Sequence, residues 1–102
     1  MDKARIELRK ALQYLDFGRP EQGELCLKRV IEYAESEGDG VTYIRAAVCY
    51  GDLLWEAERF GAAESWLRLA LDRFDALQPD TDVLDMEVSR ARTLLERMGQ
   101  TR

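Results

Sequence analysis

The sequence lacks histidine and asparagine, and it contains only two prolines and two cysteines. Without histidine the chain has neither the commonest general base nor the commonest metal ligand. Cys26 and Cys49 are too few for a tetrahedral thiolate zinc site, and their spacing matches no redox or metal motif. We expect two reduced, partly buried thiols, with a disulfide or a reactive thiol as alternatives, and no metal or other cofactor.

Long apolar runs are also missing. The longest one covers residues 46–50, far short of the roughly 20 residues that span a bilayer. Residues 1–5 lead into mixed charge without the apolar stretch of a signal peptide. We therefore expect a cytoplasmic protein that does not enter a membrane.

Neither sign of charge dominates the chain. Twenty acidic side chains face 15 basic ones, for a net charge of −5, and the arginines are scattered. Such a surface disfavours nonspecific binding of nucleic acid. A chain of 102 residues with 46% apolar content is enough for one domain with one modest core.

Motifs for catalysis are absent as well. There is no phosphate-binding glycine loop and no nucleophile motif. Carboxylate pairs such as Asp72 with Asp75 and Asp82 with Asp85 have a helical spacing that is typical of a solvated face. We expect that the protein is not an enzyme.

What the chain does contain is helical periodicity interrupted by glycine and proline. Apolar residues recur every three to four positions between breaks near 18–20, 38–41, 59–61 and 78–81. No segment alternates as a strand does. The pattern predicts an all-α protein with five helices, over residues 3–17, 20–36, 41–58, 61–77 and 81–98.

The helices repeat with a period of 40 residues. Small residues coincide at Ala11, Gly51 and Ala91, and large apolar ones at Leu15, Trp55 and Leu95. The second helices match in the same way, for example Leu27 with Leu67. A fixed period between 20 and 50 residues indicates a stacked array of helix pairs. We expect repeats over 3–37 and 41–77, followed by a capping helix over 81–99, within one domain of residues 1–102.

The clearest unit resembles the tetratricopeptide repeat (TPR) family. It carries Ala47, Tyr50, Gly51, Leu54, Ala63, Leu67, Ala70 and Leu71 at the family spacing, with an aromatic at Phe60. The first unit keeps the spacing at Ala11, Tyr14, Gly23, Leu27 and Val30. The 40-residue period exceeds the usual 34 or so and is similar to the repeats of kinesin light chains and some bacterial regulators. Ala47 replaces a frequent tryptophan, and Pro79 falls later than the usual closing proline.

The resemblance implies a right-handed superhelix whose first helices line a concave groove for a partner peptide or helix. The positions implied for this groove are Arg5, Leu8, Arg9, Leu12, Leu15, Arg45, Val48, Asp52, Trp55, Arg92 and Leu95. The apolar members would form its floor, and the arginines its basic rim. Asp52 stands where a carboxylate clamp of the family has asparagine, so we do not expect that clamp.

Two interpretations of these surfaces remain open. The chain is a protein-interaction adaptor that binds a partner segment in the groove, or a structural module whose exposed faces make it a homodimer. The leucines of the groove face can equally pack between helices. Trp55, as the largest side chain of the set, is the strongest candidate for a binding anchor.

Overall fold

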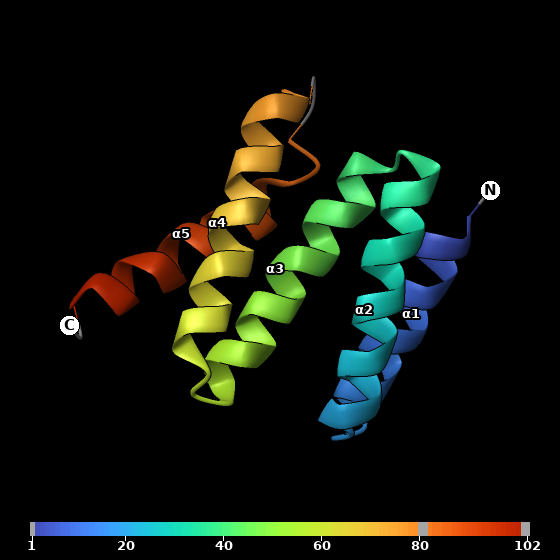
Figure 1. Ribbon diagram of the computed structural model, residues 1–102, viewed down its shortest axis with the longest axis horizontal. Coiled ribbons are helices and arrows are strands. Elements are labelled where there is room, and N and C mark those ends of the chain that lie inside the picture. Colours follow the sequence, from blue (N-terminus) through green and yellow to red (C-terminus); the bar gives the residue numbers. More distant parts are fainter. Residues whose placement is uncertain (1, 80–81, 101–102) are drawn as a thin grey trace.

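The computed structural model describes residues 2–79 and 82–100 and is helical almost throughout (Figure 1). Its five helices are α1 (Lys3–Asp16), α2 (Pro20–Glu37), α3 (Gly40–Glu56), α4 (Phe60–Leu77) and α5 (Asp85–Gln100). No strand occurs within the described ranges. The predicted all-α fold with five helices is therefore confirmed. The first two breaks fall at the predicted glycines and proline, whereas the third falls at residues 57–59, just before Gly61, which lies inside α4.

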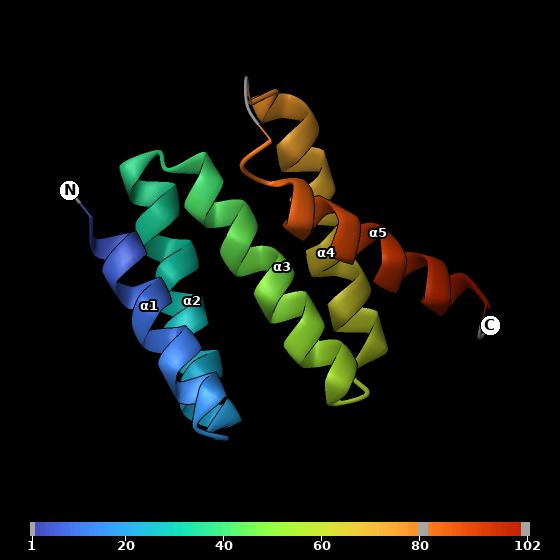
Figure 2. The same ribbon diagram turned by 180° about the vertical axis from the view of Figure 1, so that it is seen from behind.

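The helices form two layers around α3. The antiparallel pairs α1–α2 and α3–α4 lie side by side, with α2 and α4 toward the viewer in Figure 1. From behind, α1 and α5 are in front, on either side of α3 (Figure 2). Helix α3 packs against α2, α4 and α5, and nine of its residues are buried, more than in any other helix. It is the centre of the core.

The 40-residue repeat is visible in the backbone of the turns. Gly18 and Glu58, which are equivalent positions, have left-handed φ angles of 72° and 61°. Gly38 and Gln78 form a second equivalent pair, with φ angles of 68° and 45°. The equivalent turns of the two halves thus share a left-handed residue, which is consistent with a helical repeat.

Small residues let the helices of each pair approach closely. A Cβ atom placed on Gly51 would lie 2.6 Å from Leu67 Cδ2 and 3.5 Å from the Ala63 carbonyl oxygen. Gly51 therefore lies close to the backbone of α4 at Ala63 and is covered by the Leu67 side chain. In the first pair a Cβ on Gly23 would lie 2.6 Å from Leu15 Cδ2. Each pair thus has one glycine at its crossing, covered by a leucine of the partner helix.

Carboxylates satisfy free backbone groups at two helix starts. Glu37, the last residue of α2, accepts hydrogen bonds from the backbone N–H groups of Lys3 (3.0 Å) and Ala4 (3.3 Å) at the start of α1. Asp39 accepts one from the backbone N–H of Thr42 (3.1 Å) at the start of α3. The Glu37 cap therefore joins the start of α1 to the end of α2, two parts of the hairpin that are distant in sequence.

The last helix begins later than its sequence pattern predicted. Residue 81, the expected start, lies outside the described residues, and α5 begins at Asp85 after a turn closed by the Asp85 N–H and the Asp82 carbonyl (3.0 Å). The helix has separate buried and exposed faces. The buried face consists of Leu84 just before the helix and Val88, Ala91, Leu94 and Met98 within it, and the exposed face of Asp85, Ser89, Arg92 and Glu96.

Candidate functional site

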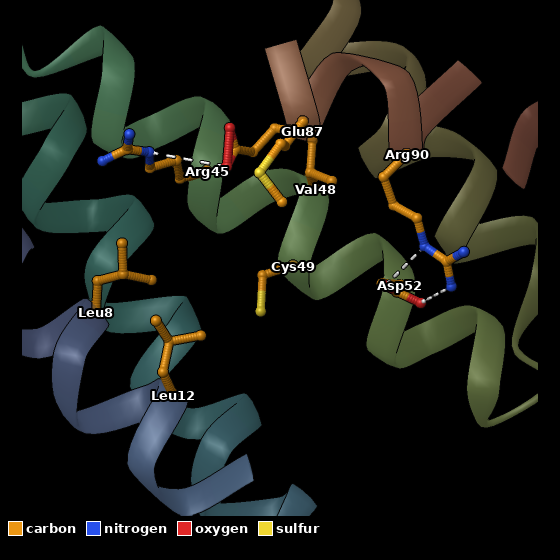
Figure 3. Close-up of a pocket in the computed structure, with 9 residues that line it drawn as sticks. Leu8, Leu12, Arg45, Val48, Cys49, Asp52, Glu87 and Arg90 are labelled. Carbon is orange, nitrogen blue, oxygen red and sulfur yellow. Dashed lines mark hydrogen bonds and ion pairs between the residues drawn. The ribbon is translucent and has the colours of Figure 1, made fainter. Parts of the chain in front are cut away.

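A groove of about 300 Å³ runs between α1, α3 and α5. Helix α3 forms its floor with four residues: Arg45, Val48, Cys49 and Asp52. Leu8 and Leu12 of α1 form one wall, and Met86, Glu87 and Arg90 of α5 form the other. In Figure 3 both leucines and Cys49 point into the space between α1 and α3.

The surface of the groove is largely apolar. Leu12 is 44% exposed on the α1 wall, and Met86 is 83% exposed on the α5 wall. Leu8 and Cys49 are half-buried between them. Large apolar side chains left exposed around a hollow are typical of interaction sites.

The charged residues of the groove pair with one another. Arg90 of α5 donates two hydrogen bonds of 3.0 Å to the Asp52 carboxylate of α3. Arg45 donates to the Val83 carbonyl oxygen (3.3 Å) and lies 3.9 Å from Glu87 Oε2 (Figure 3). The hydrogen bonds to Asp52 raise the pKa of Arg90, in spite of partial burial. These contacts hold the α5 wall against the floor, although the buried Oε1 atom of Glu87 has no hydrogen-bond partner among the described residues.

The two thiols are unpaired. Cys26 is buried and Cys49 is half-buried, as the sequence indicated. Burial, followed by the nearby Asp52 charge, raises the pKa of Cys49 to about 11. The side chain is therefore a neutral thiol at pH 7 and presents a weakly polar surface to the groove.

Five of the eleven predicted groove positions line this groove: Leu8, Leu12, Arg45, Val48 and Asp52. Arg5 and Arg9 are exposed on α1. Because Arg5 precedes Leu8 by three positions and Arg9 precedes Leu12 by three, helical spacing places both arginines beside the α1 wall.

The other four positions lie elsewhere. Leu15 covers Gly23 inside the first helix pair. Trp55 is half-buried, with its ring edge-on to Phe60 at a centroid distance of 6.1 Å. Leu95 is half-buried against the core. Arg92 is exposed and lines a different, polar hollow with Phe74 and Glu96.

Met86, Glu87 and Arg90 form a wall that repeat equivalence did not identify. Their counterparts on α3 are Ala46, Ala47 and Tyr50, all buried. On α5 the same side faces the groove, since α5 lies across α3 from α1 (Figure 2). The sequence carries one signal of this wall: position 90 is the charged Arg90, whereas its repeat counterpart on α3 is the buried Tyr50.

Within the described part of the chain, no three or more metal-ligating side chains gather in a way that could hold a metal ion. None of the described helices combines the length and apolar character needed to cross a membrane. Comparison of the chain with family models, curated proteins and solved structures found no match.

Proposed function

We propose that the protein is a non-catalytic interaction module, a TPR-like helical array that binds a peptide or helix of a partner protein in the α1–α3–α5 groove. The observation that carries the proposal is the open apolar groove formed by the first helix of each repeat unit. Two free thiols suit a reducing compartment, and we place the module in the cytoplasm.

The position of the groove supports this function. Equivalent residues of two repeats meet there: Leu8 and Val48 are 40 positions apart, as are Leu12 and Asp52, and all four line it. A surface built from repeated positions extends along the array, and it suits an elongated ligand.

The dimensions also favour a side-chain ligand. A volume of about 300 Å³ is at the lower end for a small-molecule pocket. It can hold a few apolar side chains from one face of a helix, which is how amphipathic helices dock in grooves. Leu12 and Met86 on opposite walls would contact those side chains from both sides.

Selection from a displayed peptide library tests the proposal. Peptides selected on the natural protein should bind with an apolar pattern in common, and Leu12→Asp should weaken their binding at least ten-fold. The matched control is Leu25→Asp, since Leu25 is similarly exposed (56%) but lies on α2, outside the groove. Equal loss of binding in both variants, or in neither, would place the binding surface elsewhere.

Self-association is the second candidate, and the outer side of α1 favours it. Ile6 is 62% exposed, whereas the equivalent Ala46 of α3 is fully buried. Tyr50, one turn further along α3, donates a hydrogen bond to Glu24 of α2, so a helix covers this side of α3. Phe17, 78% exposed at the end of α1, extends the uncovered apolar surface that a second copy would bury.

Sedimentation equilibrium tests the second candidate. If copies associate through α1, Ile6→Lys with Phe17→Lys should shift the natural protein from dimer to monomer, and Leu25→Lys should not. A monomer at all concentrations, or a dimer that resists the double substitution, would exclude this interface.

A further inference from the structure

We propose that the ligand of the groove presents uncharged apolar side chains to the floor and acidic side chains to the α1 rim, which we define as Arg5 and Arg9. This inference rests on the proposed function, because it specifies the chemistry of the same ligand. It follows from the contrast between charges that are paired inside the groove and charges that are unpaired at one edge.

The charged side chains of the floor already have partners within the protein. Asp52 and Arg90 satisfy each other through two hydrogen bonds of 3.0 Å. Arg45 is held by the Val83 carbonyl and by Glu87 on the α5 wall. A charged ligand side chain placed among Leu8, Leu12 and Met86 would lose water and gain no counter-charge, which is costly. An apolar side chain gains free energy there by covering apolar surface.

The α1 rim has the opposite character. Arg5 and Arg9 are exposed and have no hydrogen bond or ion pair with any described residue. Helix α1 carries four basic and two acidic side chains, although the whole chain has a net charge of −5. One of the two acids, Glu7, is buried and is already engaged by Arg29 (3.5 Å) and Lys10 (3.8 Å). The two arginines are therefore available for carboxylates of a ligand, which guanidinium groups bind in a bidentate manner.

The charge also changes along the edge of the groove that α1 forms. Asp16 follows Leu12 by four positions, is exposed, and has no ion pair with a described residue. Going along α1, the edge of the groove thus changes from basic near Arg5 to acidic near Asp16. A ligand with carboxylates at one end should place that end beside the start of α1.

Three synthetic amphipathic peptides test the inference. They share one stripe of Leu and Ala and differ only in the residues along one flank at one end, which are Glu, Gln or Lys. Fluorescence anisotropy measures the Kd of each labelled peptide for the full chain. We expect the Glu peptide to bind about ten-fold more tightly than the Lys peptide, because two exposed ion pairs replace two repulsive contacts, and the difference should shrink in high salt.

Charge reversal of the rim provides the decisive comparison. Arg5→Glu with Arg9→Glu should reverse the order of the Glu and Lys peptides. Arg92→Glu is the matched control, since Arg92 is an exposed arginine outside the groove. Circular dichroism should show that both variants stay folded.

The outcomes separate this inference from the proposed function. If all three peptides bind equally and Leu12→Asp abolishes their binding, the groove binds ligands but the acidic preference is wrong. Arg92→Glu changes the net charge by half as much as the rim variant does, so a shift in preference half as large as the shift caused by the rim variant reflects net charge and also overturns the inference. If no peptide binds, or Leu12→Asp has no effect, the proposed function fails as well.

Discussion

Asp52 of α3 and Arg90 of α5 face each other in a fork-to-fork arrangement, with Nε to Oδ2 and Nη2 to Oδ1 distances of 3.0 Å each. Together with the Arg45 contacts to Val83 and Glu87, this pair positions the α5 wall. The geometry is bidentate, which is the favourable form of the interaction. The Arg90 and Asp52 side chains are nevertheless 38% and 33% exposed, respectively, so solvent weakens the interaction.

Replacing Arg90 by Gln should lower the free energy of unfolding by about 0.5–1 kcal/mol, because a partly exposed ion pair is screened. Urea unfolding measures this. In a double-mutant cycle with Asp52→Asn, the two losses of unfolding free energy should be less than additive. The coupling free energy between the two residues should decrease at high salt concentration. Strict additivity would mean that the pair does not stabilise the packing of α5.

Glu58→Gly should stabilise the protein. Glu58 has a φ of 61°, and a left-handed conformation costs a residue with a Cβ about 1 kcal/mol. Glycine occupies the equivalent position 18 in the first turn. Because glycine also loses more entropy on folding, we expect a net gain of up to about 1 kcal/mol in a thermal melt.

The reciprocal change, Gly18→Ala, should destabilise the protein by about 1 kcal/mol for the same reason. A lower melting temperature for Glu58→Gly would mean that the Glu58 side chain makes a compensating interaction.

Gly51→Ala should destabilise the second helix pair by about 1–3 kcal/mol, because the added methyl group overlaps Leu67 and forces the helices apart. Gly61→Ala is the matched control: it lies in α4, and a Cβ there meets no atom within 4 Å. That substitution should be neutral or slightly stabilising, since alanine is the better helix former. Equal melting temperatures for both variants would contradict the close crossing at Gly51.

The contact between Tyr50 and Glu24 predicts a pH dependence of stability. The Tyr50 hydroxyl donates a 2.8 Å hydrogen bond to Glu24 Oε2. This bond lowers the pKa of Glu24 below its ordinary 4.5, although burial opposes it. A carboxyl whose pKa is lowered on folding stabilises the native state above pH 4.5, and this contribution is lost as the pH falls through the folded pKa.

The same contact predicts a second loss of stability at high pH, through the Tyr50 hydroxyl. Burial, and then the bond to Glu24, raises the pKa of Tyr50 from 10 to about 12. Its contribution is full below pH 10 and is lost as the pH rises toward 12. Tyr50→Phe should destabilise the protein by about 1 kcal/mol at pH 7 and flatten both limbs of the stability profile. Urea unfolding from pH 3 to 11 would show this, and parallel profiles for the two proteins would refute it.

The helices and their turns could be predicted from sequence because their causes are local. Gly18, Pro20 and Gly38 mark the first two turns, and the 40-residue shift shows which later positions are equivalent to them. The floor of the groove was also predictable. Val48 and Asp52 share repeat positions with Leu8 and Leu12, and all four line the groove.

The α5 wall and the place of Trp55 could not be predicted in this way. The direction of α5 depends on contacts with residues about 40 positions away, such as Asp52 with Arg90, and no local pattern encodes that angle. Leu15, Trp55 and Leu95 share one repeat position, and all three are half-buried. Leu15 shows the reason, since it covers the small residue Gly23 of the facing helix. Helical spacing predicts the side of the helix on which such a side chain lies. It does not predict whether that side chain packs within its helix pair or is exposed in a groove.

The two walls of the groove come from opposite ends of the chain. Helices α1 and α5, which are described along their whole lengths, make no contact with each other, and Leu12 and Met86 are 74 positions apart in sequence. Among the described helices, α3 alone contacts both of them. A ligand that touches both walls would therefore add a second connection between the terminal helices. Binding would then slow hydrogen exchange at both ends of the protein together, because opening either helix would first require the ligand to leave.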